Sequence, residues 1–271
     1  MNAGPVADPA APLGTASRPQ PSGETATGRT GFGPIVRVRA PGVRLSAWPA
    51  LVGLGTAVAL VTQGLLAARL ALPVTSILLL ALVACLIGLV GGKVYYLAEH
   101  PNRSRSLTNM TSGMCLQGFV LAAVGTVVLG ALLLGVPVGE LLDVTAPGLL
   151  FGMAIGRVGC FFGGCCAGRP TRSRWGLWSS DRRLGTRRIP TQLLESTMAL
   201  LLGVAALLIV VILAPQPHGV VFAGGIAAYT LGRQLLFPLR DLPRRTARGR
   251  IVTMAISGFV LLAAVLAAVL G

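Results

Sequence analysis

The stretch TQLLESTMALLLGVAALLIVVIL, residues 191–213, decides the fold. It holds a single charged side chain, Glu195, close to its start. A helix needs about 20 predominantly apolar residues to cross the hydrocarbon of a bilayer, so this stretch predicts a transmembrane helix. The strands of a membrane β-barrel would alternate apolar and polar residues, and this stretch does not alternate. A helix also satisfies its own backbone hydrogen bonds, which lipid cannot do.

Six further apolar runs accompany this stretch, which predicts an all-α, polytopic membrane protein with seven transmembrane helices. Of the 271 residues, 54% are hydrophobic and only 11% are charged, whereas roughly a quarter are charged in a soluble domain. Pro, Gly or charged residues bracket the first six runs and act as stops. The seven runs are residues 47–66, 74–97, 113–135, 144–163, 191–213, 219–237 and 251–270.

The N-terminal residues 1–43 differ from the rest of the chain. They are rich in Pro, Gly, Ala, Thr and Arg and have few large apolar side chains. Such a composition cannot bury enough apolar surface to fold, so we expect a disordered N-terminal tail. It lacks the apolar core and the cleavage site of a signal peptide. The transmembrane domain is then expected at residues 44–271.

Basic residues gather on one side of the predicted bundle. The formal net charge is +15, from 23 Lys and Arg against 8 Asp and Glu. The tail and the loops after the second, fourth and sixth helices hold the arginines, whereas Arg69 lies on the other side with Glu140 and Asp143. Because these loops are short and border apolar runs, they indicate contact with anionic lipid headgroups rather than nucleic acid. The positive-inside rule would place this side in the cytoplasm.

Polar side chains inside the apolar runs are expected at one depth in the membrane. Late residues on even-numbered helices and early residues on odd-numbered helices share one level, because successive helices alternate in direction. Polar groups within a bilayer are costly and usually mark a functional site. Six residues from five helices meet this description: Lys93, Gln117, Arg157, Gln192, Glu195 and Arg233. Snorkelling to the headgroups is the favoured explanation for Lys93, and an ion pair is favoured over a base for Glu195.

Arg157 is the strongest candidate for a binding residue. It lies in Gly156-Arg157-Val158-Gly159, and small residues on a helix face permit close approach of a neighbouring helix. An arginine on such a face is expected to point into the bundle. Its guanidinium can hold a phosphate through two parallel hydrogen bonds. With Arg233 as a second contact, the sequence predicts a pocket for an anionic phospholipid head that opens sideways to lipid.

The cysteines do not form a recognisable metal or disulfide framework. There are five, an odd number, in a chain that is not a small secreted scaffold. The C-x4-C-C spacing of Cys160, Cys165 and Cys166 is not a zinc pattern, and no histidine is close in sequence. We interpret these side chains as packed, inert thiols and expect no metal site.

Five segments resemble, in order, motifs of the prolipoprotein diacylglyceryl transferase family. The signature region falls in residues 143–171, around Gly156-Arg157-Val158-Gly159-Cys160-Phe161. The other four are GGKVYY at 91–96, SGMCLQG at 112–118, IPTQLLE at 189–195, and YTLGR at 229–233 followed by Arg240. One such motif would be weak evidence, but five in the right order are specific. The resemblance covers about residues 44–270.

The resemblance implies a seven-helix membrane enzyme without a cofactor. Such an enzyme moves the diacylglyceryl group of phosphatidylglycerol, or another anionic phospholipid, onto a cysteine thiol in the lipobox peptide of a prolipoprotein. It implies a multi-pass protein of the cell (plasma or inner) membrane whose active face looks outward, opposite to the positive-inside expectation. The catalytic residues would be Arg157, Arg233 and Gln117. The substrate-binding residues would be Arg157, Arg233, Gly156, Gly159, Gln192, Glu195, Arg240 and Lys93.

The chain departs from the family pattern at the positions of the residues suited to proton transfer. Gln117 stands at the position of the family's histidine, and an amide is no base at neutral pH. Cys165 stands at the position of the signature glutamate. A non-catalytic phospholipid-binding membrane protein of the same fold is therefore the alternative. A transporter of small anions ranks third, because the sequence shows no paired interrupted helices or internal repeats.

Overall fold

A computed structural model describes residues 38–40, 43–45, 47–99, 116–178, 186–213, 217–241 and 249–270. All of them belong to one compact unit, residues 32–271. The expected N-terminal tail falls almost entirely outside the described residues, so its predicted disorder stays a prediction. The side chain of Gln117 also lies outside them, although its backbone belongs to a helix.

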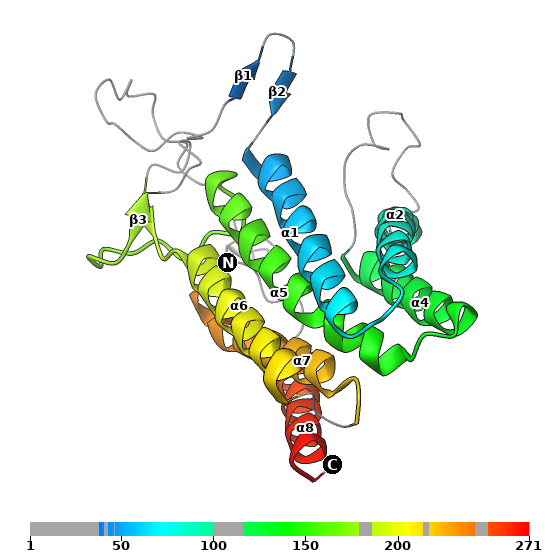
Figure 1. The fold of residues 1–271 in the computed structure, drawn as a ribbon. Helices are drawn as coiled ribbons and strands as arrows, with labels where there is room; N and C mark the ends of the chain where they lie inside the picture. Colours follow the sequence, from blue (N-terminus) through cyan, green and yellow to red (C-terminus); the bar gives the residue numbers. More distant parts are fainter. Residues whose placement is uncertain are drawn as a thin grey trace, which may run out of the picture. The chain divides into compact units, whose positions relative to one another are not determined.

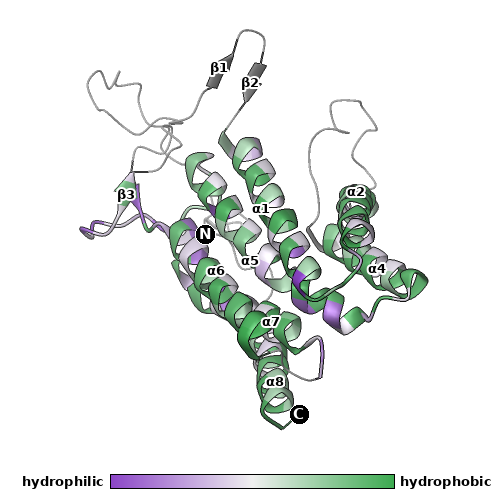
Figure 2. Ribbon diagram, viewed as in Figure 1, coloured by the Kyte–Doolittle hydropathy of each residue, from purple (hydrophilic) through white to green (hydrophobic). Residues whose placement is uncertain are grey.

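Seven apolar helices account for most of the described chain (Figures 1 and 2). Six of them are long and apolar enough to cross a membrane, and α4 is a shorter apolar helix. The predicted all-α, multi-pass membrane architecture is thereby confirmed. The helices are α1 Ala47–Arg69, α2 Val74–Glu99, α4 Leu116–Leu134, α5 Val138–Phe162, α6 Thr191–Leu208 with its π-helical continuation η2 Ile209–Leu213, α7 Val220–Leu236 with the 3-10 turn η3 Phe237–Leu239, and α8 Gly249–Leu270.

Two short antiparallel strand pairs supplement the helices. The strand β1 Val38–Ala40 pairs with β2 Val43–Leu45, directly before α1. The strand β3 Leu177–Trp178 pairs with β4 Arg187–Arg188, between α5 and α6. The second pair belongs to the connection between α5 and α6, which is hydrogen-bonded to the residues before α6 and after α7.

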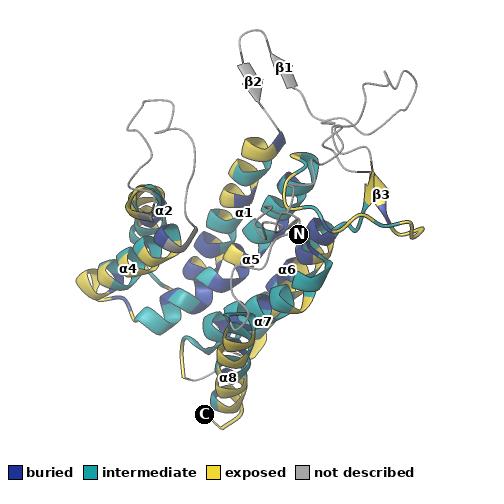
Figure 3. Cartoon of the chain, turned by 180° about the vertical axis from the view of Figure 1, so that it is seen from behind, coloured by how far each residue is buried: buried dark blue, intermediate teal, exposed yellow. Residues whose placement is uncertain are grey.

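Helix α5 is the centre of the bundle (Figure 3). It packs against α1, α6 and α7, whereas α2 packs mainly on α4, and α8 packs on α7. In the most apolar stretch of α5, 44% of the residues are buried, compared with 11% in the corresponding stretch of α8. The buried residues of the core accordingly include five apolar side chains from α5: Leu141, Val144, Ala146, Leu150 and Ala154. The helix that carries Arg157 is therefore the one most enclosed by protein.

Helices α1 and α5 approach each other through small residues. A Cβ atom added at Gly148 would lie 2.5 Å from the carbonyl oxygen of Ala59, and one added at Gly55 would lie 2.8 Å from that of Gly152. Such contacts are shorter than van der Waals packing allows, so only glycine fits. Small residues four apart are the usual means of close helix packing in membranes. This approach fixes α5 against α1.

The fourth helix begins earlier than predicted. The sequence indicated a start at residue 144, with Glu140 and Asp143 in a loop, but α5 begins at Val138 and contains both. Asp143 is buried and accepts hydrogen bonds from the amides of Gly219 (2.6 Å) and Phe222 (3.0 Å) at the start of α7. A carboxylate satisfies the free amides of a helix N-terminus and its positive dipole. The other helix ends differ from the predicted ones by three residues or fewer, where described.

Replacement of Gly148 by alanine should loosen the α1–α5 contact. The added methyl group meets the backbone of Ala59, which cannot rotate away, so the free energy of unfolding should fall by about 2 kcal/mol. The measurement is thermal unfolding of the purified protein in detergent. The matched control is Gly53→Ala, because nothing lies within 4 Å of a Cβ atom added there. Equal melting temperatures for the two variants would contradict the packing described.

Candidate functional site

The site lies where the end of α5, the start of α6 and the end of α7 meet. The connection after α5 is fixed to both neighbours by backbone hydrogen bonds. The amide of Gly168 donates to the carbonyl of Ile189 (3.1 Å), and the amide of Arg169 donates to that of Leu239 (2.9 Å). Arg188 adds an ion pair with Asp241 at 2.7 Å. Three segments far apart in sequence are thus held at one end of the bundle.

A buried carboxylate organises the charges at this end. Glu195, on α6, is 1% exposed and lies between two guanidinium groups. Its Oε2 is 2.9 Å from Nε of Arg157 on α5, and its Oε1 is 3.4 Å from Nη1 of Arg240 after η3. Buried charges are tolerated when they are paired, because the pairing offsets the loss of hydration. Glu195 therefore holds together arginines from two different segments, which confirms its expected ion pair.

Helix α7 adds a tyrosine and a third arginine. Nε of Arg157 also donates to the hydroxyl of Tyr229 at 3.3 Å. Arg233, one turn further along α7, is close enough to interact electrostatically with Arg157, Arg240 and Glu195. Within the described residues it makes no hydrogen bond or ion pair. The cluster thus sums three positive charges and one negative charge, a surplus of two positive charges, and Arg233 is available for an anion.

Two cysteines of the loop after α5 are exposed rather than packed. Our interpretation of Cys165 and Cys166 as packed thiols was therefore wrong. The start of α6 holds their backbone: Nε2 of Gln192 donates to the carbonyl of Cys165 (2.7 Å), and Oγ1 of Thr191 donates to that of Cys166 (3.3 Å). Cys166 has a φ of 58°, a left-handed conformation that is unfavourable for a residue with a side chain.

The thiols of this loop also perturb each other. Side-chain hydrogen bonds with Cys160 and Cys165 lower the pKa of Cys166, and the positive charges of Arg240 and Arg157 lower it further. The corresponding bonds with Cys160 and Cys166 raise the pKa of Cys165. The arginines of the cluster therefore act on Cys166, whereas the shift of Cys165 arises from its neighbouring thiols and from burial.

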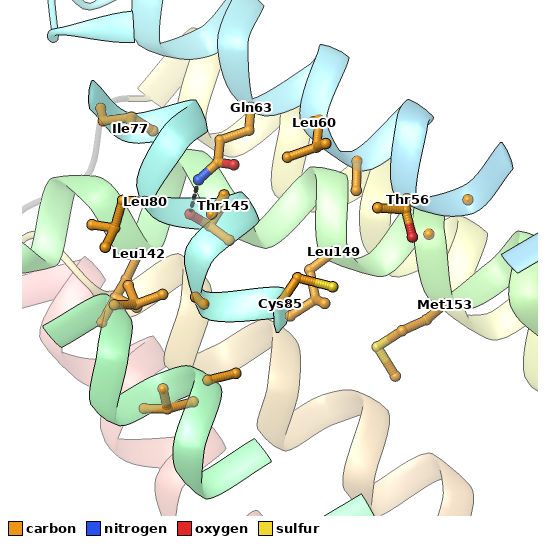
Figure 4. A pocket seen from close by; sticks show the side chains of 18 of the residues that line it. Thr56, Leu60, Gln63, Ile77, Leu80, Cys85, Leu142, Thr145, Leu149 and Met153 are labelled. Carbon is orange, nitrogen blue, oxygen red and sulfur yellow. Dashed lines mark hydrogen bonds between the residues drawn. The ribbon is translucent and has the colours of Figure 1, made fainter. Parts of the chain in front are cut away.

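An apolar cavity lies beside α5 (Figure 4). It has a volume of about 340 Å³ and lies between α1, α2, α4 and α5. Its one polar pair is the hydrogen bond of 2.7 Å from Nε2 of Gln63 to Oγ1 of Thr145, seen in Figure 4. Gly156, the residue before Arg157, is part of its wall. Helix α5 therefore contributes both to the wall of this cavity and, through Arg157, to the charged cluster.

The structure brings together four of the predicted site residues and places the others nearby or elsewhere. Arg157, Arg233, Glu195 and Arg240 form the charged cluster. Gln192 supports the cysteine loop, Gly156 borders the cavity, and Gly159 packs against α1. Lys93 lies on α2 with its ammonium 5.5 Å from the ring centre of Tyr96. The positions of these residues do not test the catalytic and substrate-binding roles predicted for them. The side chain of Gln117 lies outside the described residues.

Sequence reasoning missed two residues of this site. Tyr229 lies four residues before Arg233, so helical spacing places both on one face of α7. This spacing could have identified Tyr229 from the sequence. Cys166 had no such signal. Its position depends on a left-handed turn that a cysteine does not predict.

Comparison with known proteins relates the chain to one family. Residues 36–270 match the sequence pattern of the family described as prolipoprotein diacylglyceryl transferase. A Streptomyces coelicolor protein named phosphatidylglycerol–prolipoprotein diacylglyceryl transferase 2 is 37% identical over 162 residues, covering 54% of this chain and 50% of that protein. A transferase of the same name from Clostridium tetani, without the numeral, is 25% identical over 229 residues, 81% of this chain and 88% of that protein. One from a Nostoc species is 33% identical over 167 residues, 55% of this chain and 58% of that protein. The chain thus spans about half the length of the first and third of these relatives.

Replacement of Glu195 by glutamine should destabilise the protein strongly. The amide keeps the shape of the side chain but leaves Arg157 and Arg240 without their buried counter-charge, at a cost of about 3 kcal/mol. Thermal unfolding in detergent measures the loss. The control is Glu140→Gln, whose partner His218 is 40% exposed and whose pair should contribute less than about 1 kcal/mol. A loss at Glu195 no larger than that at Glu140 would contradict the organising role of this carboxylate.

Proposed function

We propose that this chain, which belongs to the prolipoprotein diacylglyceryl transferase family, transfers the diacylglyceryl group of phosphatidylglycerol to a cysteine thiol of a prolipoprotein. Its relatives carry the name of this activity. One observation supports the proposal above the others. A charged cluster with two surplus positive charges, formed by α5, α6 and α7, shares helix α5 with an apolar cavity within a multi-pass membrane bundle.

The charged cluster suits the phosphate of the donor lipid. Arg233 has no anionic partner among the described residues, and the closest contacts of Arg157 with Glu195 and Tyr229 both use its Nε. We expect the Nη groups of Arg157 to meet the phosphate, because two parallel N–H donors match two phosphate oxygens. Glu195 lowers the repulsion between the guanidinium groups, so that they can share one depth.

The apolar cavity suits an acyl chain of the same lipid. Side chains from α1, α2, α4 and α5 line it, and its wall reaches Gly156 beside Arg157. A phospholipid has its phosphate and its acyl chains a few bonds apart, so it requires charge and apolar space next to each other. Burial of an acyl chain contributes about 0.8 kcal/mol for each methylene group.

The reaction is a displacement at carbon. The acceptor thiolate attacks the glycerol carbon that bears the phosphate, a C–S bond forms, and the C–O bond breaks. Glycerol phosphate leaves with the electron pair of that bond. Negative charge accumulates on the leaving phosphate, and we expect Arg157 and Arg233 to stabilise it. Fixed donors of this kind are worth about two to three orders of magnitude in rate.

The acceptor and the compartment belong to the same proposal. The acceptor is a lipobox cysteine of an exported precursor, and the protein resides in the cell (plasma or inner) membrane with this site facing outward. Restored growth of a host depleted of its own transferase, with loss of rescue by Arg157→Ala, tests both together. A chain that is expressed in the membrane but gives no rescue would contradict them.

Removal of the free guanidinium group should abolish most of the transfer activity. Arg233→Ala is expected to reduce turnover about 100-fold, since it removes a charge that stabilises the leaving phosphate. The measurement is thioether formation from labelled phosphatidylglycerol and a lipobox peptide by the purified protein. Arg69→Ala is the control, because Arg69 ends α1 at the opposite face and is exposed. Wild-type protein that retains phosphatidylglycerol without forming product would instead establish the non-catalytic lipid-binding alternative.

A bulky residue in the cavity should select against long acyl chains. Thr56 lines the cavity from α1 and is exposed to it, so Thr56→Phe should narrow the space without displacing the core. We expect KM for long-chain phosphatidylglycerol to rise several-fold and KM for short-chain lipid to change little. The matched control is Ala57→Phe, at an exposed neighbouring position that does not line the cavity. Equal effects on both chain lengths would place the acyl chains elsewhere.

A further inference from the structure

The connection between α5 and α6 carries a large excess of positive charge. Residues 163–190 contain seven arginines and one acidic residue, Asp181. Two of these arginines serve the protein itself, since Arg187 donates to backbone carbonyls and Arg188 pairs with Asp241. Among the described residues of the connection, three other arginines are exposed and make no side-chain hydrogen bond or ion pair: Arg169, Arg172 and Arg174. An anion from the surroundings can therefore reach these three.

The turn at residues 171–176, which presents two of these arginines, is shaped by its own hydrogen bonds. Oγ1 of Thr171 accepts from the amide of Ser173 at 3.1 Å, and Oγ of Ser173 accepts from the amide of Trp175 at 3.3 Å. From β4, the side chain of Arg187 donates to two carbonyls of the turn, at 2.9 and 3.2 Å. The turn therefore has a defined shape before any partner binds, so little conformational entropy remains to be lost on binding.

This shape holds a large aromatic side chain away from the protein. Trp175 is 74% exposed, and the guanidinium carbon of Arg174 lies 5.2 Å from the centre of its ring. Leu177, on the adjoining strand β3, is exposed as well. Exposed apolar groups rimmed by charge mark interaction sites. Tryptophan is enriched at membrane–water interfaces, where its ring meets the acyl region and its N–H meets the headgroups.

The turn extends to the side of the bundle, next to the end of α6 (Figures 1 and 3). Its base is attached where three helical segments end, because the amide of Gly168 donates to Ile189 and that of Arg169 donates to Leu239. Helices of this length and composition end at the membrane surface. A segment that leaves these ends sideways therefore lies over the neighbouring lipid headgroups rather than far out in water.

We propose that the turn 171–176 binds anionic phospholipid headgroups of the leaflet beside the bundle. Arg172 and Arg174 contact the phosphate groups, and Trp175 inserts its ring at the level of the glycerol backbone. This contact is formed by other residues than the charged cluster of Arg157, Arg233 and Arg240, and it does not rest on the proposed function. Each basic side chain near an anionic leaflet strengthens binding about fivefold. The contact would hold against the membrane a connection that is hydrogen-bonded to the residues before α6 and after α7.

The test follows the accessibility of Trp175 in nanodiscs. The chain has three tryptophans, so Trp48→Phe with Trp178→Phe leaves Trp175 as the only one. One set of discs contains phosphatidylcholine alone, and the other also contains phosphatidylserine, which is anionic without being the donor lipid of the proposed function. Quenching of Trp175 by acrylamide, which is neutral, should be about twofold weaker in the anionic discs, because the charged leaflet attracts the arginines. High salt should remove the difference, because it screens exposed charges.

The controls are two single substitutions in the same background. Arg172→Gln should reduce the protection of Trp175 by phosphatidylserine, since one of the two contacting charges is lost. Arg69→Gln removes the same charge from an exposed position at the opposite face and should leave the protection intact.

Equal quenching of Trp175 in the two sets of discs, or equal effects of the two substitutions, would overturn the proposal. Protection by an acidic peptide in neutral discs, without protection by phosphatidylserine, would also overturn it and would assign the turn to a protein partner. Since no arm of this experiment measures diacylglyceryl transfer, a failure here leaves the proposed function standing, and a failure of the transfer assay leaves this inference standing.

Discussion

The buried contact of Glu195 with Arg157 and Arg240 is the interaction on which the site depends. Three guanidinium groups would repel one another strongly at the low dielectric of a membrane interior. One carboxylate from α6 pairs with two of these groups at distances of 2.9 and 3.4 Å and leaves the cluster positive overall. The cluster thus keeps the net positive charge that attracts an anion. It also has enough charge compensation to fold, which three uncompensated guanidinium groups would not have.

Helix α5 connects this electrostatic centre to the rest of the bundle. Its glycines bring α1 close on one side, its polar end meets α6 and α7 on the other, and its wall separates the apolar cavity from the arginines. The most buried helix is therefore also the one that links the two chemical environments a phospholipid requires. The unusual sequence of α5, which combines glycines, Pro147, Asp143 and Arg157 in one membrane helix, follows from these contacts.

Much of this arrangement could be predicted from the sequence. Apolar runs long enough to span a bilayer determined the helices, and the alternation of helix direction placed Arg157, Glu195 and Arg233 at one level. Asp143 was misplaced because a charged residue in an otherwise apolar run looks like a helix boundary, whereas its partners are the amides of α7. The exposure and backbone of Cys166 could not be predicted, because they depend on how α6 holds a loop from 25 residues earlier. The cavity depends on the rotation of four helices, which composition does not determine.

The contacts of Asp143 have a mechanical consequence for the bundle. Helices α5 and α7 are joined at one end by Asp143 and at the other by Arg157 and Tyr229, so neither can slide along its axis past the other. The pair of α2 and α4 has no comparable polar fastening to α5 among the described residues, and α4 touches α5 only sparsely. The half of the bundle that contains α5 and α7 is therefore expected to be more rigid than the half that contains α2 and α4. Under the proposed function, the tail of the donor lipid would meet the least resistance where these two halves adjoin.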